Sequence, residues 1–255
     1  MKYLHICIST LLMLSLNSVV FGGNTITFPS ADGLLVTADI HAPYKNGEAP
    51  VIVLFHQAGW SRGEYTEIVP WLNSLGYNCI AVDQRSGESV RGVDNATAQR
   101  ALKENRPTGY VDALPDIMAA LAYARRHYGK SGVVAWGSSY SAALVLKVAG
   151  DHPEMVDGVL AFSPGEYFGR AGKSASWIQD SARHIRVPVF ITSALNEADR
   201  WGAIFVALDS GGSVSFLPKT EGRHGSRALW KKYPDSGAYR DAVQAFLLRY
   251  LPPGK

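Results

Sequence analysis

Residues 133–141 read Val-Val-Ala-Trp-Gly-Ser-Ser-Tyr-Ser, and this stretch decides how the rest of the chain is interpreted. Its first four residues form a short apolar run, which is typical of a buried strand. Residues 140–148 are rich in alanine and leucine, as expected for a helix. A strand that passes into a helix through so short a turn lifts one side chain clear of the backbone.

The turn matches the pattern of a nucleophile elbow, G-x-S-x-G, with Ser141 in place of the last glycine. The positions two before and two after the exposed residue crowd each other, so both must be small. Ser139 meets this requirement with Gly137 and Ser141, whereas Ser138 would have Trp136 two positions before it. The spacing therefore predicts Ser139 as a nucleophile. A serine-rich helix start, in which Ser138 or Ser139 only caps the helix, is the alternative.

The composition is that of an ordinary globular protein, with 47% hydrophobic and 18% charged residues in a chain of 255. This length is enough for one large domain with a full core. The net charge of +3 is small and the basic residues are scattered, which argues against a nucleic-acid-binding protein. Cys7 lies in the N-terminal apolar run and Cys79 is otherwise alone, so we expect no disulfide and no cysteine-based metal site. We expect no metal and no cofactor.

The N-terminus has the pattern of a secretory signal peptide. Lys2 gives a positive start, residues 4–21 are almost wholly apolar or small, and Gly22 and Gly23 break the run. Cleavage near residues 20–23 would leave a single mature domain over residues 23–255, periplasmic or secreted, with no membrane span. An uncleaved membrane anchor is the alternative, because the run is near the lower length limit for a span.

Past residue 23, apolar runs alternate with helical patterns. The Asp32-Gly33 turn predicts a β-hairpin at the start of this region. Strands are predicted at residues 25–28, 34–41, 51–56, 78–82, 133–136, 158–162, 187–193 and 213–217. Helices are predicted at residues 65–75, 111–128, 140–148, 200–208 and 238–250, with an irregular stretch at 163–186 and a loop or short helix within 86–107. All-apolar strands that alternate with helices predict an α/β fold, with a mostly parallel central sheet covered by helices on both faces.

The candidate reactive residues follow predicted strands. Ser139 follows the strand at 133–136, Glu197 and Asp199 follow the strand at 187–193, and His224 follows the last strand. Reactive groups gather at the carboxyl ends of the strands in such sheets. A serine hydroxyl needs an imidazole to take its proton, and a carboxylate orients that imidazole. The order serine, acid, histidine therefore predicts a catalytic triad.

These features together resemble the α/β-hydrolase fold, and within it the smaller serine hydrolases of the dienelactone-hydrolase-like or esterase type. The stretch H-Q-A-G at 56–59 resembles the His-Gly oxyanion loop, with Gln57 at a position that is usually glycine. The stretch D-Q-R-S-G-E-S at 83–89 resembles the D-x-R-G-x-G-x-S segment that follows the fourth strand. The resemblance covers nearly the whole mature chain. It implies that Ser139 is the nucleophile, His224 the base, and Glu197 or Asp199 the acid.

The resemblance also implies where the acid and the oxyanion donors lie. In the fold that it resembles, a strand commonly reads P-V-x-x-x-x-G-x-x-D, which places Glu197 at the acid position when counted from Pro188. Asp199 falls two residues late and suits the start of a helix. The implied oxyanion donors are the N–H of Tyr140 and the N–H of Ala58 or Gln57.

The expected function is that of a secreted serine hydrolase that cleaves an ester or related acyl bond in a small-molecule substrate. A peptidase, a thioesterase or a non-catalytic binding protein on the same fold are the alternatives. The aromatics Tyr167, Phe168 and Trp177 lie among glycines in residues 163–186. They predict a small lid that lines an acyl pocket, with a plain surface connection as the alternative. The oligomeric state is left open.

Overall fold

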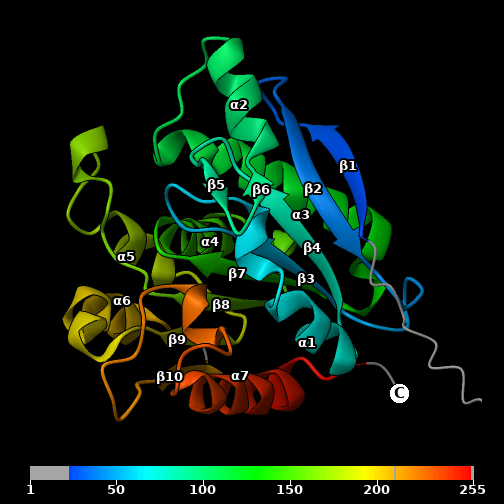
Figure 1. The fold of residues 1–255 in the computed structure, drawn as a ribbon. Helices are drawn as coiled ribbons and strands as arrows, with labels where there is room; N and C mark the ends of the chain where they lie inside the picture. The colour runs from blue at the N-terminus through cyan, green and yellow to red at the C-terminus, as the bar shows by residue number, and fades with distance from the viewer. Residues whose placement is uncertain (1–22, 210, 254–255) are drawn as a thin grey trace, which may run out of the picture.

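The computed structural model describes residues 23–209 and 211–253 (Figure 1). The predicted signal peptide over residues 1–22 lies outside the described residues. No helix in the described part of the chain is long and apolar enough to cross a membrane.

A mixed sheet runs through the described residues. Its strands in spatial order are β1 (Asn24–Pro29), β2 (Leu35–His41), β4 (Asn78–Asp83), β3 (Val51–Phe55), β7 (Val133–Ser138), β8 (Gly158–Phe162), β9 (Val189–Thr192) and β10 (Ser213–Phe216). Strand β2 pairs antiparallel with both β1 and β4, and the other neighbours pair in parallel. The prediction of a mostly parallel sheet with an antiparallel N-terminal hairpin is therefore confirmed.

Helices cover both faces of this sheet (Figure 1). The helices α1 (Ile68–Ser74) and α7 (Ser236–Tyr250) pack on one face. On the other face lie α3 (Leu114–Tyr128), α4 (Tyr140–Asp151), α5 (Trp177–Ala182) and α6 (Gly202–Ala207). The remaining helix, α2 (Ala96–Lys103), lies beside β2 and β4.

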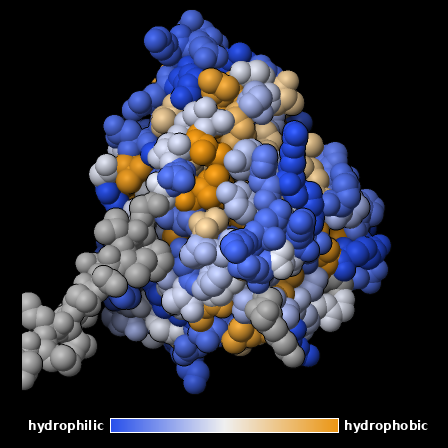
Figure 2. All heavy atoms as spheres, turned by 90° about the vertical axis from the view of Figure 1, so that its right-hand side faces the viewer, coloured by the Kyte–Doolittle hydropathy of each residue, from blue (hydrophilic) through white to orange (hydrophobic). Residues whose placement is uncertain are grey.

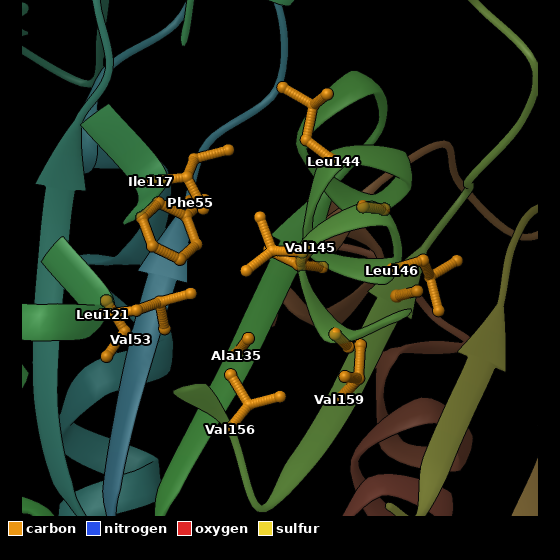
Figure 3. Packing of buried hydrophobic residues seen from close by; sticks show 14 of the residues in the cluster. Val53, Phe55, Ile117, Leu121, Ala135, Leu144, Val145, Leu146, Val156 and Val159 are labelled. Carbon is orange, nitrogen blue, oxygen red and sulfur yellow. The ribbon is translucent and has the colours of Figure 1, made fainter. Parts of the chain in front are cut away.

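The hydrophobic core explains why the central strands are continuous apolar runs. Side chains of β3 alternate between the two faces: Val53 and Phe55 join the cluster under α3 and α4, whereas Ile52 and Leu54 join the cluster under α1 and α7. Figure 3 shows Ile117 and Leu121 of α3 against β3, and Val145 of α4 over β7. A strand buried on both faces has no polar positions to alternate with.

The structure gives the detail of two predicted segments. The helix expected at 65–75 begins only at Ile68, because residues before it form the 3₁₀ turn η1 (Arg62–Tyr65), capped by the side chain of Ser61. The polar stretch 86–107 holds a short hairpin of β5 (Ser89–Val90) and β6 (Val93–Asp94) and then α2. Asn95 begins α2, since its side chain accepts the N–H of Ala98 at 2.8 Å.

The remaining short helical turns lie in connections between these elements. They are η2 (Val111–Ala113), η3 (Gly129–Ser131), η4 (Pro153–Met155), η5 (Gly169–Ala171), η6 (Leu195–Arg200) and η7 (Ser226–Leu229). Two of them position the candidate site, since η6 carries Glu197 and η7 follows His224.

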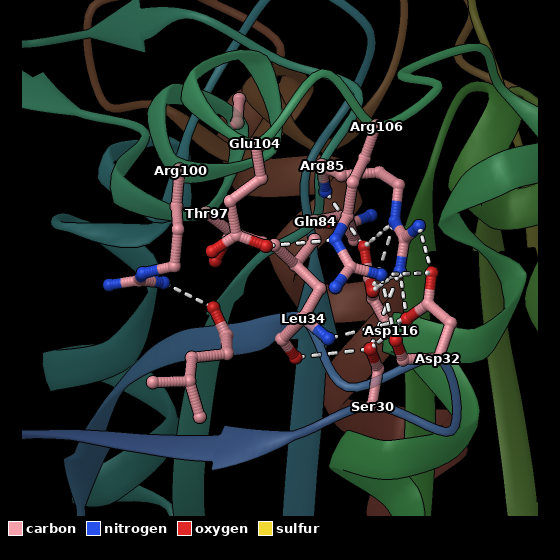
Figure 4. A network of polar contacts seen from close by, with 12 residues as sticks. Ser30, Asp32, Leu34, Gln84, Arg85, Thr97, Arg100, Glu104, Arg106 and Asp116 are labelled. Atoms are coloured by element: carbon pink, nitrogen blue, oxygen red, sulfur yellow. Dashed lines mark hydrogen bonds and ion pairs between the residues drawn. The ribbon is translucent and has the colours of Figure 1, made fainter.

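A buried arginine ties three separate segments together (Figure 4). Arg85, directly after β4, pairs with Asp116 of α3 at 2.7 Å and with Asp32 of the β1–β2 turn at 2.6 Å. The Arg85 hydrogen bonds hold the pKa of Asp32 well below its usual range. Arg85 thus braces the hairpin against the body of the fold.

The face of the molecule on the right-hand side of Figure 1 is mostly hydrophilic, with hydrophobic residues gathered in a patch between the hydrophilic ones (Figure 2). An open, mainly apolar hollow on the protein surface is formed by the β1–β2 turn and α3, and its lining includes Pro29, Leu114 and Met118. None of Ser139, Glu197 and His224 is among the residues that line this hollow.

Candidate active site

The turn between β7 and α4 has the geometry of a nucleophile elbow. Ser139 stands between the two elements with φ 59° and ψ −122°, a conformation that few residues other than glycine adopt. At Gly137 any side chain would collide with the next turn, because a Cβ there would lie 2.4 Å from the Ser141 carbonyl oxygen. The small residue at this position is therefore a steric requirement of the turn.

The departure from the elbow pattern at Ser141 has a local explanation. The Ser141 hydroxyl donates to the backbone oxygen of His56 at 2.6 Å and also contacts the side-chain amide of Gln84. Residues 56–60, which follow β3, are called the 56–60 loop below. A glycine at position 141 would lose this link between the elbow and the 56–60 loop.

Three side chains from separate strand ends form a hydrogen-bonded chain. His224 Nε2 lies 2.8 Å from Ser139 Oγ, and His224 Nδ1 lies 2.6 Å from Glu197 Oε1. With Nδ1 facing a carboxylate, the imidazole donates there, which leaves Nε2 to accept the serine proton. The structure thus brings together Ser139, His224 and Glu197.

Glu197 is held from several sides. Its second carboxylate oxygen accepts the Ser163 hydroxyl at 2.7 Å, and that hydroxyl oxygen accepts the Gly225 N–H at 2.9 Å. Burial acts to raise the pKa of Glu197, but the hydrogen bonds from His224 and Ser163 outweigh it and lower the pKa. Asp199, the other candidate acid, is exposed and takes no part in the hydrogen bonds that join Ser139, His224 and Glu197. Counting from Pro188 therefore selected the residue that contacts His224.

The 56–60 loop offers two candidate backbone donors for an oxyanion, the N–H groups of Gln57 and Ala58. They differ in whether they already donate a hydrogen bond. The Gln57 N–H donates to the Glu64 carboxyl at 2.8 Å, so it is already engaged. The half-buried Ala58 has no hydrogen bond from its N–H within residues 23–209 and 211–253, which leaves Ala58 as the better candidate. Tyr140 occupies the first position of α4, where a backbone N–H has no partner inside the helix.

His56 gives the 56–60 loop its shape. Its Nδ1 lies 2.8 Å from the Gln57 oxygen and its Nε2 lies 3.1 Å from the Gln84 nitrogen. Burial lowers the pKa of His56, so the ring is neutral, with Nδ1 donating and Nε2 accepting. The hydrogen bonds of the His56 ring therefore join the 56–60 loop to the segment that follows β4.

The aromatics of residues 163–186 pack in or against the core, and none of the three is among the residues that line the pocket at Glu197 and His224. The acyl pocket expected from them stays a prediction. Phe168 is buried and packs edge-on against Trp177 at 4.9 Å, and both rest on the core beneath α4. The Lys147 ammonium of α4 lies 4.8 Å from the Trp177 ring. Tyr167 contacts a residue of the site: its hydroxyl donates to the backbone oxygen of Ser163 at 2.7 Å, and the Ser163 hydroxyl donates to Glu197. Burial, with the nearby Glu197 charge, raises the pKa of Tyr167 to about 12.

Two residues of the site were missed from the sequence. Ser163 follows β8 as Ser139 follows β7, so its place at a strand end was a usable signal. Glu64 accepts the Ser138 hydroxyl at 2.7 Å and is fully buried. The spacing of Ser61 and Glu64 is that of a capping box, which disguises Glu64 as an ordinary helix-start residue.

An open pocket of about 590 Å³ lies beside Glu197 and His224. His224 and Glu197 form part of its wall, and Arg223 and Arg227 form another part. A substrate of modest size can therefore reach the imidazole from solvent. Among the residues that the structure describes, no group of three His, Cys, Asp or Glu side chains is placed to hold a metal ion.

Comparison with solved structures shows that this chain shares its fold with several esterases and other hydrolases. It is similar to the esterase Pf2001 of Pyrococcus furiosus, with 16% identity over 91% of this chain and 93% of that one and a TM-score of 0.69. A dienelactone hydrolase from Anabaena variabilis shares 13% identity over 90% and 98% of the two chains, with a TM-score of 0.67. Acetyl xylan esterase 1 from Thermoanaerobacterium sp. shares 17% identity over 92% and 86%, with a TM-score of 0.64.

Sequence comparison adds the family. The comparison with curated proteins finds no match. The family model of the alpha/beta hydrolase fold matches residues 50–183, which include the 56–60 loop, the elbow and β8. This match covers more than half of the chain and agrees with the sheet order and the elbow, so the protein belongs to the alpha/beta hydrolase fold family.

Proposed function

We propose that this protein is a serine hydrolase that cleaves an ester or a related acyl bond in a small-molecule substrate. The observation that carries the proposal is the pair of hydrogen bonds that joins Ser139 to His224 at 2.8 Å and His224 to Glu197 at 2.6 Å. A serine hydroxyl is a weak nucleophile until a hydrogen-bonded base takes its proton. The geometry supplies that base and the carboxylate that orients it.

The proposed reaction has two halves. Ser139 Oγ attacks the substrate carbonyl carbon while its proton passes to His224 Nε2. The tetrahedral intermediate then expels the leaving group, which takes the proton from His224, and an acyl-enzyme remains. Water attacks the acyl-enzyme in the same way, with His224 as base, and releases the acid and free Ser139. Glu197 stabilises the imidazolium in both halves without taking its proton.

The negative charge on the substrate oxygen needs donors that are fixed in advance. We propose the N–H groups of Tyr140 and Ala58 for this role. Tyr140 lies at the N-terminus of α4, where the helix dipole favours negative charge. Loss of one such donor typically raises the barrier by about 3 kcal/mol. Of the three aromatics, Tyr167 remains the candidate for a substrate contact.

The test is hydrolysis of p-nitrophenyl acetate by the wild type and by Ser139→Ala. We expect the wild type to release p-nitrophenol with saturation kinetics, and the variant to lose at least about a thousandfold in kcat/KM. The short ester is chosen because esterases are among the structures of similar fold. Equal rates for the two proteins would contradict the proposal. A lack of turnover across a series of esters and thioesters would favour a non-catalytic binding protein.

We also propose that the protein is exported. The support is the apolar run at residues 4–21 behind Lys2, which ends at two glycines. Intact-mass analysis of the natural protein should find an N-terminus near Gly23 in the periplasmic or extracellular fraction. Full-length chains in the membrane fraction would contradict export and favour an uncleaved anchor.

A further inference from the structure

Glu64 is a fully buried carboxyl group that the proposed reaction does not use. It lies in the 3₁₀ turn η1, shortly after the 56–60 loop. Its backbone is held on two sides, since Trp230 Nε1 donates to the Glu64 oxygen at 2.9 Å and the neighbouring Tyr65 hydroxyl donates to the Phe55 oxygen at 2.7 Å. Burying a carboxyl group is costly, and a neutral side chain would avoid that cost.

The two oxygens of this carboxyl are divided between two parts of the site. Oε1 accepts the hydroxyl of Ser138, the residue immediately before Ser139, at 2.7 Å. Oε2 accepts the N–H of Gln57, the residue immediately before Ala58, at 2.8 Å. One side chain therefore sets the spacing between the elbow and the 56–60 loop.

A third part of the site is reached through Ser138. The hydroxyl oxygen of Ser138 accepts the N–H of Ser226 at 2.9 Å, and Ser226 lies two residues after His224. Gly225, which lies between His224 and Ser226, has no room for a side chain. A Cβ there would lie 2.5 Å from Ser138 Oγ and 2.7 Å from Gln57 Oε1. The segments that carry the nucleophile, the imidazole and the Ala58 donor thus meet around one carboxyl group.

We propose that Glu64 is a positioning residue of the active site, whose carboxylate holds the elbow, the 56–60 loop and the His224 segment in register. The proposal rests on the proposed function, because the residues that Glu64 aligns are those assigned to nucleophile, base and oxyanion donor. Both oxygens of an ionised carboxyl accept, as Ser138 and Gln57 require. A protonated carboxyl or an amide has one accepting oxygen and a donor, so the bond to Ser138 must reverse.

The surroundings of Glu64 bring the pKa of its carboxyl close to neutral pH. Burial raises the pKa of Glu64 to about 7, against the lowering effect of the Ser138 and Gln57 hydrogen bonds and of the Arg227 charge. Arg227 faces Glu64 from η7, and Tyr65 follows it in η1. Arg62 of the same turn is paired with Asp39 and Asp83.

The experiment measures the rate constant for modification of Ser139 by a fluorophosphonate in the wild type and in Glu64→Gln, from pH 5 to pH 9. The ratio of the two rate constants removes the pH effects that both proteins share. We expect a ratio near one at pH 5, where both side chains have one accepting oxygen. The ratio should rise through about pH 7 to about ten at pH 9, the effect of one lost hydrogen bond.

Controls separate this role from a structural one. Glu67→Gln changes a carboxyl three residues along the chain, which binds Arg91 and the Lys231 N–H, and should give a ratio of one throughout. If Glu64→Gln does not fold, Ser138→Ala removes the hydroxyl that Glu64 accepts, and its ratio should also rise with pH. A ratio that is flat across pH in the folded variant overturns the proposal, even if both proteins react. A wild type that does not react at Ser139 overturns the proposed function itself.

Discussion

The acid of the hydrogen-bonded chain is a glutamate, although an aspartate lies two residues further on. Glu197 contacts His224 at 2.6 Å from the turn η6, and its longer side chain spans the gap. Asp199 is exposed and makes no hydrogen bond to His224 among those of the described residues. The choice between them follows from backbone spacing after β9 and not from side-chain type.

Replacement of the two acids should therefore have unequal effects. Glu197→Gln is expected to lower kcat by roughly 10³- to 10⁴-fold, because the imidazole loses the carboxylate that orients it. Asp199→Asn should leave kcat within about twofold, since surface substitutions away from a site change little. Steady-state hydrolysis of a p-nitrophenyl ester measures both, with circular dichroism to establish that each variant is folded. The reverse pattern would make Asp199 the acid.

Glu64 also makes stability depend on pH in a defined direction. The folded protein raises the pKa of this carboxyl from an ordinary value of 4.5 to about 7. Below pH 4.5 the group is protonated in both the folded and the unfolded state, so burial carries no ionic cost. As the pH rises towards 7, the unfolded state releases its proton first and the folded state loses relative stability.

The difference in free energy of unfolding between wild type and Glu64→Gln isolates this effect from other groups. The free energy of unfolding of the wild type, relative to that of Glu64→Gln, should fall by about 3 kcal/mol between pH 4.5 and pH 7. Above pH 7 the difference should stay constant. Urea unfolding at a series of pH values measures it. A difference that is constant across this range, or that changes in the opposite direction, would refute the raised pKa.

What the sequence reveals about single residues depends on how local the signal is. Ser139 could be predicted because the small residues that its turn requires lie within two positions of it. Glu64 could not, because its role arises from Ser138 and Gln57, which are distant in sequence from one another. The sequence around Glu64 does not distinguish a buried residue that positions the site from a residue that caps a helix.

At the scale of elements, the same rule separates the correct predictions from the incorrect ones. The hairpin of β1 and β2 and the helix α4 follow local turn and helix signals, and both were predicted. The helix predicted at 65–75 begins only at Ile68, and the residues before it form η1, where Tyr65 and Glu64 make tertiary contacts that no local pattern encodes. In residues 163–186, Phe168 packs against Trp177 and both contact the core, and the lid expected there stays a prediction.

The Arg85 network is a test of how these elements are held together. Asp116→Asn removes a carboxylate that is wholly buried against Arg85 and leaves the guanidinium with Asp32. Breaking a buried pair typically costs 3–5 kcal/mol, and with Asp32 still in place we expect about 3 kcal/mol. The exposed Asp241→Asn on α7 is the control and should change stability by less than about 0.5 kcal/mol. Thermal and urea unfolding that find no loss for Asp116→Asn would show that the network does not brace the fold.

At the scale of the whole molecule, the fold class was predictable and the strand order was not. All-apolar runs such as β3 and β7 require a sheet covered on both faces, which the two core clusters provide. The placement of β4 between β2 and β3 arises from pairings between distant segments, which no local pattern encodes. The parallel pairing of β7, β8, β9 and β10 brings the carboxyl ends of these strands to one edge of the sheet, where the candidate site lies.

The central claim is that this edge carries a serine nucleophile activated by His224. The most direct measurement is intact-protein mass spectrometry after treatment with a fluorophosphonate, followed by peptide mapping. Ser139 Oγ should form a bond to phosphorus as fluoride leaves, so the wild type should gain one phosphonyl group on the peptide that holds Ser139. Ser139→Ala should gain none, and His224→Ala should react more slowly by orders of magnitude. Equal labelling of the wild type and Ser139→Ala, or labelling on any other peptide, would contradict the claim.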